Sequence, residues 1–235
     1  MPKKGQKAKP KKSSAQGHHS HLKGFSSKAV HIGNEPDPGT GAVVRPICTS
    51  STFILPYEER PNNELGHIYS RISHPNKVAF QETMAALEKG KHGIAFSSGL
   101  ATANGIMNTL KTGDHIICSG ELYGGMYQYF SEMATEHMGM TFTFLSFADE
   151  KKYKKSFTSK TKLVWMENPT NPLLKIYDIE KIAQIAHQHG ANLVVDNTFM
   201  TPFFQVFFYA FSNSLFLCIS TPPKMLLFLN LDSLI

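Results

Sequence analysis

Short apolar runs alternate with helix-like patterns through the middle of the chain, from about residue 26 to residue 205. Apolar runs with β-branched or aromatic residues predict strands at residues 93–96, 115–118, 142–146, 163–166 and 192–195. Helical spacing predicts helices at residues 75–89, 100–110 and 178–189, the last with Asp178 as N-cap and Gly190 as its stop. This alternation predicts the α/β class, with a mostly parallel sheet that helices cover on both faces.

The two ends of the chain differ from this middle part. Residues 1–24 contain seven lysines and no acidic residue, which predicts a disordered basic tail. Residues 206–235 are rich in phenylalanine but show neither a helical nor a strand period. Their longest apolar stretch is shorter than the roughly 20 residues that span a membrane, so no membrane partner is predicted. We therefore expect an ordered domain at residues 25–205, between a basic tail and a hydrophobic tail of different character.

Composition and charge narrow the possible partners. The 235 residues are 41% hydrophobic and 18% charged, which is typical of a globular protein and excludes a mostly disordered chain. Subtracting the seven tail lysines from the net charge of +6 leaves −1 for the rest, so no nucleic acid is expected on the body. A contact of the tail with nucleic acid or an anionic surface stays open.

The cysteines indicate the compartment. There are three of them, Cys48, Cys118 and Cys218, and they are widely spaced in the sequence. An odd, scattered set is not a disulfide framework or a cysteine-type zinc site, and it favours reduced thiols inside the cell. We therefore expect a cytoplasmic protein.

Candidate chemistry lies just after the predicted strands, where parallel sheets gather their ligands. Ser98, Gly99 and Leu100 follow one strand and open a helix, an arrangement that can hold a phosphate group. Tyr123 lies before two glycines and can stack on a flat ligand. Asp196 ends another strand and can bind a protonated ring nitrogen. Each feature also has an ordinary structural interpretation: a helix cap, a loop tyrosine or a turn aspartate.

Two further residues extend this set. Asn171 lies in the proline-rich turn that follows residues 163–166, which can direct its amide above the sheet or can be an ordinary turn. Arg71 can bind a phosphate group through two hydrogen bonds or can be a surface residue. Taken together, a phosphate-binding helix start, a stacking ring, an aspartate and an additional arginine are what a phosphorylated pyridine ring requires.

Six motifs in the same order carry a family resemblance. Residues 26–205 resemble the Cys/Met-metabolism family of enzymes that depend on pyridoxal 5′-phosphate (PLP). The resemblance implies a fold-type I PLP-dependent domain, an α/β fold. Its motifs are Ala42-Val43-Val44-Arg45-Pro46-Ile47, Tyr69-Ser70-Arg71, Phe96-Ser97-Ser98-Gly99-Leu100-Ala101, Glu121-Leu122-Tyr123-Gly124-Gly125, Pro169-Thr170-Asn171-Pro172 and Asp196-Asn197-Thr198-Phe199.

The resemblance also implies roles for single residues. Tyr123 stacks on the pyridine ring and is the catalytic candidate, as a proton acceptor near the substrate amine. Asp196 keeps the ring nitrogen protonated, and Asn171 lies close to the substrate. Tyr69 and Arg71 reach the phosphate of a neighbouring subunit, which implies a homo-oligomer with a site shared across a dimer interface, and a tetramer as its assembly. The implied cofactor-binding residues are Tyr69, Arg71, Gly99, Leu100, Tyr123, Asp196 and Thr198.

The implied activity is that of a carbon–sulfur lyase of transsulfuration. Its substrate is a sulfur amino acid, and the preferred reaction converts cystathionine to cysteine, 2-oxobutanoate and ammonia. The other reactions of the family stay open: β-elimination from cystathionine, γ-replacement that forms cystathionine, and γ-elimination from methionine.

One expected element does not appear. Family members carry a Ser-x-Thr-Lys segment after the aspartate, whose lysine binds the cofactor as a Schiff base. Beyond Asp196 this chain has one lysine, Lys224, which follows two prolines in a segment unlike that motif. A second hypothesis is therefore a catalytically inactive chain without the Schiff-base lysine, in which the loss of strands beyond residue 205 leaves an open sheet edge.

Overall fold

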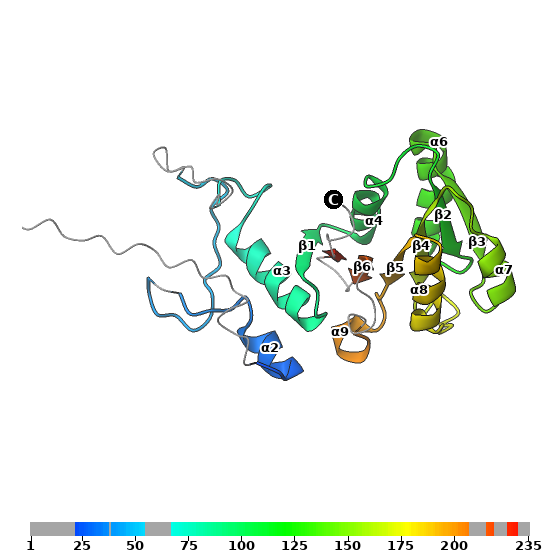
Figure 1. The fold of residues 1–235 in the computed structure, drawn as a ribbon. Coiled ribbons are helices and arrows are strands. Elements are labelled where there is room, and N and C mark those ends of the chain that lie inside the picture. Colours follow the sequence, from blue (N-terminus) through cyan, green and yellow to red (C-terminus); the bar gives the residue numbers. More distant parts are fainter. Residues whose placement is uncertain (1–21, 38, 55–66, 207–214, 219–224, 230–235) are drawn as a thin grey trace, which may run out of the picture.

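The computed structural model describes residues 22–37, 39–54, 67–206, 215–218 and 225–229 (Figure 1). Within these residues the strands form one sheet in the order β1-β7-β6-β5-β4-β2-β3. The strands are β1 (His92–Phe96), β2 (His115–Ser119), β3 (Thr141–Leu145), β4 (Thr161–Glu167), β5 (Asn192–Asp196), β6 (Leu215–Cys218) and β7 (Met225–Leu229). The five strands expected from the apolar runs are confirmed as β1 to β5.

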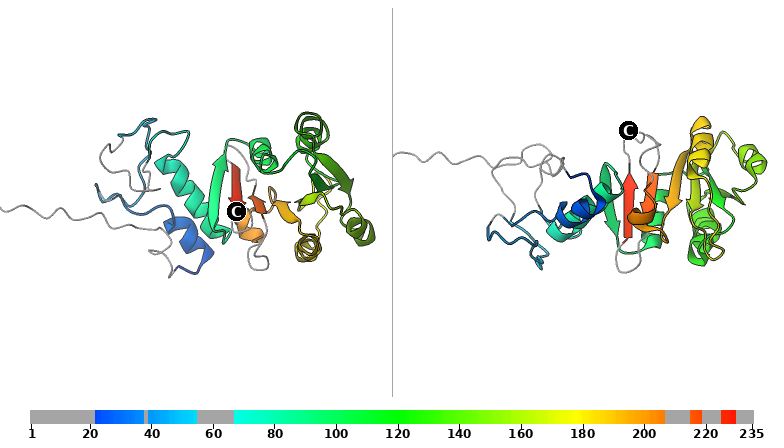
Figure 2. Two further views of the ribbon diagram at one scale, coloured as in Figure 1. Left: turned by 45° about the horizontal axis from the view of Figure 1, so that its top comes forward. Right: turned by 90° about the horizontal axis from the view of Figure 1, so that it is seen from below.

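The sheet is mostly parallel, as expected. From β3 through β2, β4 and β5 to β6, every neighbouring pair is parallel. Only β7 runs the other way, and it is antiparallel to both β6 and β1. Figure 2 shows β7 beside β1, although more than 120 residues of chain separate them in the sequence.

The three expected helices are present with shorter ends. They are α3 (Pro75–Leu87), α4 (Gly99–Met107) and α8 (Ile179–Gln188). The Asp178 side chain accepts the Lys181 N–H at 3.1 Å, which confirms it as the N-cap of α8. Gly190 has a φ of +71°, the left-handed conformation that ends a helix and favours glycine. The sequence pattern missed α2 (Phe25–His31), α5 (Gly124–Gln128), the π-helix η1 (Tyr129–Ala134), α6 (Thr135–Met138), α7 (Glu150–Lys155) and α9 (Thr201–Phe204).

Helices cover both faces of the sheet, and each face has its own apolar core. Alternate residues of one strand point to opposite faces, so the sheet contributes to both cores. On one face, Val164 and Val195 pack with residues of α3, α7 and α8. On the other face, Trp165 and Val194 pack with residues of α4, α5 and η1. The expectation of a sheet covered on both faces is confirmed.

The structure corrects one expectation about the C-terminal tail. The tail pattern predicted no regular structure and an open edge beside β5, but β6 pairs with β5 and β7 pairs with β1. Both strands are short, continuous apolar runs without an alternating period, a pattern that is typical of strands in parallel sheets. The unpaired N–H and C=O groups of β5 and β1 favour such pairing. Lys224 and residues 1–21 of the basic tail lie outside the described residues.

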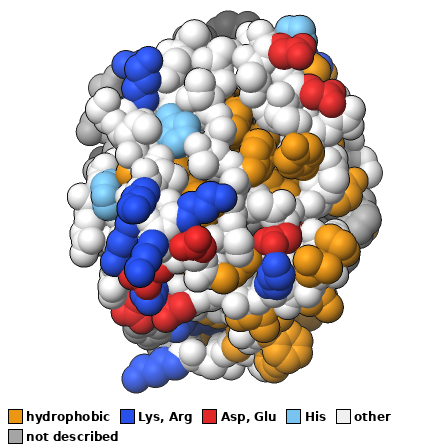
Figure 3. Space-filling model, turned by 90° about the vertical axis from the view of Figure 1, so that its right-hand side faces the viewer, with side chains coloured by type: hydrophobic (Ala, Val, Ile, Leu, Met, Phe, Trp, Pro, Cys, Tyr) orange, Lys and Arg blue, Asp and Glu red, His pale blue; other side chains and the backbone are white. Residues whose placement is uncertain are grey.

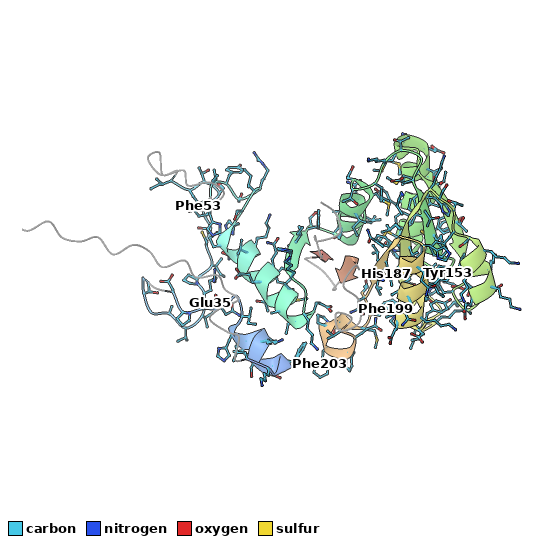
Figure 4. All side chains as sticks on the ribbon, viewed as in Figure 1. Glu35, Phe53, Tyr153, His187, Phe199 and Phe203 are labelled. Carbon is cyan, nitrogen blue, oxygen red and sulfur yellow. The ribbon has the colours of Figure 1, made fainter. Side chains whose placement is uncertain are left out.

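The N-terminal helix α2 contacts α9, the short helix after β5. Phe203 of α9 contacts Phe25 of α2 edge to face, with ring centroids 5.2 Å apart (Figure 4). Just beyond α9, the Gln205 side chain donates to the Asn168 carbonyl oxygen and to Asn197 Oδ1, each at 2.9 Å. Gln205 therefore joins the loops that follow β4 and β5.

The side of the molecule that carries α7 presents lysines and acidic residues together (Figure 3). Lys154 and Lys181 both form ion pairs with Glu150. Lys175 pairs with Glu121 at 2.5 Å, so this face alternates in sign. None of the helices among the described residues has the length and apolar character of a membrane span.

Candidate functional site

The register of the sheet brings two carboxyl groups together. Glu167 ends β4 and Asp196 ends β5, and their Cα atoms are direct partners in the parallel pairing. Their side chains lie on the same face as Trp165 and Val194, because residues two apart on a strand share a face. This is the face that α4 and α5 cover.

Asp196 is buried and held in one orientation. Its Oδ1 atom accepts from the Thr198 N–H at 3.1 Å and from the Thr198 hydroxyl at 2.5 Å. Burial raises the pKa of the Asp196 carboxyl to about 6, against the lowering effect of those two bonds. Both bonds reach the same oxygen, so Thr198 leaves the second carboxylate oxygen unengaged.

Glu167 is the site residue that sequence reasoning missed. Its Oε2 atom accepts the Tyr123 N–H at 2.8 Å, and its own N–H donates to Ser119 Oγ at 3.3 Å. Burial and the nearby Asp196 carboxylate raise the pKa of Glu167 to about 7. In the sequence, a glutamate before Asn-Pro looks like a turn residue, and only the pairing of β4 with β5 puts it next to Asp196.

The Tyr123 ring lies open at the edge of this pair. Tyr123 is the N-cap of α5, and about half of it is exposed (53%). The ring lies against the backbone of Gly125, where a Cβ atom would come within 2.7 Å of the ring carbon Cε1. Glycine at position 125 therefore allows the ring to occupy this place.

Helix α4 begins with a polar N-cap residue, which two backbone N–H groups of the first turn follow. Ser98 Oγ accepts the Ala101 N–H at 3.2 Å, as an N-cap does. Gly99 and Leu100 are the first two residues of the helix, where backbone N–H groups have no acceptor within the helix. These N–H groups and the positive end of the helix dipole favour an anion.

Asn171 joins the site through its backbone. Its N–H hydrogen-bonds to Glu167, the same carboxyl group that holds Tyr123. The peptide bonds before Pro169 and Pro172 are cis. The structure therefore brings Asn171, Tyr123, Asp196 and Thr198 to one end of the sheet.

Tyr69 and Arg71 lie elsewhere, on the N-terminal arm, which is the segment between α2 and α3. The Arg71 guanidinium lies over the Tyr69 ring, 4.3 Å from its centroid, and donates to the Tyr69 hydroxyl at 3.1 Å. The backbone around Tyr69 pairs with Thr52 of the same arm. Within one copy of the chain, the structure pairs these two residues with each other and does not bring them to Asp196.

The raised pKa values predict how stability depends on pH. Between about pH 4.5 and pH 7, folded Glu167 holds a proton that the unfolded chain has lost, so its contribution to stability falls as pH rises. His67, His115 and His187 have lowered pKa values, so their contribution to stability rises with pH. Relative to the natural chain, Glu167→Gln should therefore gain about 2–3 kcal/mol of unfolding free energy between pH 5 and pH 8. Urea unfolding at both pH values measures this, and an equal difference at both would contradict it.

Comparisons with known proteins agree on one family. Residues 26–208 match the family described as "Cys/Met metabolism PLP-dependent enzyme". The chain is 42% identical over 181 residues to cystathionine β-lyase of Coxiella burnetii, across 77% of this chain and 46% of the relative. It is 43% identical over 197 residues to human cystathionine γ-lyase, across 83% of this chain and 48% of the relative.

A solved structure shares the fold. The crystal structure of metB from Corynebacterium glutamicum superposes with a TM-score of 0.79 at 33% identity, over 89% of this chain and 56% of that one. The chain thus spans about half the length of the relatives that it matches. It has the fold-type I architecture expected from the motifs, and it belongs to the Cys/Met metabolism family of PLP-dependent enzymes.

Proposed function

We propose that the end of the sheet around Tyr123 and Asp196 binds PLP. The observation that carries the proposal is the buried Asp196 carboxyl group, which Thr198 fixes through one oxygen. An exposed aromatic ring in a glycine cradle and the start of a helix lie at the same end of the sheet. A flat, phosphorylated ring with a nitrogen that can be protonated matches all three features.

Each residue has a role in this proposal. The Gly99 and Leu100 N–H groups hold the phosphate, and the Tyr123 ring stacks on the pyridine ring. Asp196 holds the proton on the ring nitrogen, and Thr198 keeps Asp196 oriented. Once bound, the cofactor supplies a ring that accepts electrons from the carbon next to the substrate amine.

For the substrate side we propose Tyr123 and Asn171. The Tyr123 hydroxyl accepts a proton near the substrate amine, and Asn171 lies next to the substrate. Their support is the shared Glu167 carboxyl group, which holds the backbone N–H of both residues.

The proposed reaction is carbon–sulfur bond cleavage in a sulfur amino acid. In the preferred form cystathionine and water give cysteine, 2-oxobutanoate and ammonia, as the bond between sulfur and the γ-carbon breaks. The names of the relatives support this class, since they include cystathionine γ-lyases, a β-lyase and a probable γ-synthase. They also leave β-elimination and γ-replacement as alternatives.

We also propose a homo-oligomer in which the arm of one subunit serves the site of another. Tyr69 and Arg71 lie on the arm away from Asp196, and the arm exposes apolar side chains such as Val43, Val44 and Ile47. A neighbouring subunit would cover these side chains, and a dimer or tetramer provides one. The free thiols of Cys48 and Cys118 support a cytoplasmic location.

A second candidate function concerns the 235-residue chain by itself. No Ser-x-Thr-Lys segment follows Asp196, and Lys224 follows two prolines. This favours a chain that holds the cofactor without a covalent bond and does not cleave substrate, because catalysis in the family uses that lysine.

The test is to trap and map any lysine–cofactor bond. After incubation with PLP and borohydride reduction, we expect label scattered over surface lysines, and no 2-oxobutanoate from cystathionine. Peptide mapping and product analysis give both results. One equivalent of label on Lys224, with cystathionine cleavage that Lys224→Ala abolishes, would instead make the chain a complete lyase.

A further inference from the structure

One carboxyl group joins three segments at the proposed site. Glu167 Oε2 accepts the Tyr123 N–H at 2.8 Å, and the Asn171 N–H hydrogen-bonds to the same side chain. The Glu167 N–H donates to Ser119 Oγ, so the end of β2 is also attached. Only 3% of Glu167 is exposed, and the loops after β2 and β4 therefore share a buried connection.

The backbone beneath this connection is fixed. The Asn168 N–H donates to the Asp196 carbonyl oxygen at 3.0 Å, which continues the pairing of β4 and β5 past both carboxyl groups. The Gln205 amide then bonds to Asn168 and Asn197, the residues that follow the two carboxyl groups. Because these hydrogen bonds fix the backbone at Glu167, its side chain can determine the positions of the loops after β2 and β4.

Packing alone does not account for a carboxyl group at this position. Burial and the Asp196 carboxylate both oppose ionisation of Glu167, so a charged Glu167 costs stability at neutral pH. A neutral side chain of the same shape could accept the two N–H groups without that cost. A carboxylate is the stronger acceptor, since hydrogen bonds to a charged oxygen are roughly twice as strong as neutral ones.

We infer that Glu167 is a positioning residue, which sets the place of the Tyr123 ring relative to Asp196 by holding the Tyr123 and Asn171 N–H groups on one carboxylate. The inference rests on the proposed PLP site. Glu167 acts through Tyr123 and Asn171 rather than by touching the cofactor.

The charges around Glu167 make its role depend on pH. Asp196 on β5 is the charge that acts on it. Glu121 and Lys175, in the two loops that Glu167 joins, form an ion pair that Tyr177 also contacts. Burial raises the pKa of Cys118 on β2, so that thiol is neutral here. The pKa of Glu167 lies at about 7, so the carboxyl group ionises as pH rises through neutrality. Its hydrogen bonds with the two N–H groups then become stronger.

The test uses binding of pyridoxamine 5′-phosphate to the 235-residue chain. This ligand has the ring and the phosphate of PLP but no aldehyde, so it does not react with lysines. Quenching of Trp165, the single tryptophan, reports binding, since Trp165 lies two residues before Glu167. At pH 8, Glu167→Gln should weaken binding about tenfold. Glu121→Gln is the matched control and should bind as the natural chain does.

A pH series separates positioning from general stability. Between pH 6.5 and pH 8.5 the natural chain and Glu121→Gln should gain affinity with an inflection near pH 7 that Glu167→Gln lacks. The titrations of the ligand are the same in all three proteins. Glu167→Gln should also be the more stable variant at pH 8, and a loss of affinity in a more stable protein is not a folding defect.

A measurement on the natural chain needs no variant. The backbone amide signals of Tyr123 and Asn171 should shift together with pH around 7, because both N–H groups bond to one titrating carboxyl group. If those signals do not titrate, or if Glu167→Gln binds with natural affinity and pH profile, the inference is wrong while the PLP site stands. If neither the natural chain nor Asp196→Asn binds the ligand, the proposed site fails, and the inference fails with it.

Discussion

Replacing Asp196 with asparagine should lower the affinity for pyridoxamine 5′-phosphate by about 30-fold or more. The Asp196 carboxyl group is buried, and Thr198 holds it through Oδ1. Asparagine keeps the size and the bonds to Thr198 but removes the negative charge that stabilises a protonated ring nitrogen. Removing one partner of a buried, hydrogen-bonded charge pair costs about 2–5 kcal/mol, which corresponds to 30-fold or more in the dissociation constant.

Quenching of Trp165 at pH 8 measures this affinity, and the chain offers a matched control. Asp178→Asn makes the same chemical change at the N-cap of α8, where asparagine caps as well as aspartate. Asp178→Asn should therefore bind the ligand as the natural chain does. Equal affinities for Asp196→Asn and Asp178→Asn would refute the proposed role of Asp196.

The largest expected effect on stability comes from Trp165. Its side chain is fully buried in β4 and packs edge to face on Phe130 of η1, with ring centroids 5.0 Å apart. Trp165→Ala leaves a cavity between the sheet and this helix, and it should cost about 3–5 kcal/mol of unfolding free energy. For a chain of this size, that lowers the melting temperature by roughly 6–20 °C.

Trp165→Phe separates packing from polarity. The indole Nε1 atom is buried and has no hydrogen-bond partner among the described residues, so phenylalanine removes a buried polar group as well as volume. We expect this variant to lose less than half as much stability as Trp165→Ala. Thermal unfolding followed by circular dichroism compares both with Ile176→Ala, which changes an exposed side chain. A Trp165→Ala melting temperature equal to that of Ile176→Ala would contradict the packing argument.

The sequence predicted the strands and helices whose signals are local. Apolar runs of four or five residues marked β1 to β5, and Asp178 and Gly190 marked the two ends of α8. Shorter helices such as α5 and α7 were not predicted, because five or six residues are too few to show a helical period. The π-helix η1 escaped because its residues do not repeat at the spacing of an α-helix.

The candidate site was predicted in part for a similar reason. Gly99 and Tyr123 follow strands and Asp196 ends one. Because parallel strands end at one edge of a sheet, the sequence showed that these residues belong together. The role of Glu167 could not be predicted, because it depends on the register that pairs Glu167 with Asp196 and on the hydrogen bond with Tyr123.

By itself the sequence determined the α/β class, the five strands from the apolar runs and the residues that end those strands. The tertiary structure decided which strands are neighbours, and it put β7 between β1 and β6. Pairing between distant segments depends on which edges remain unpaired and which faces must be covered once the whole chain is packed. The same packing turned Glu167 from an apparent turn residue into the buried partner of Asp196, because neighbouring strands share a register only after the sheet has formed.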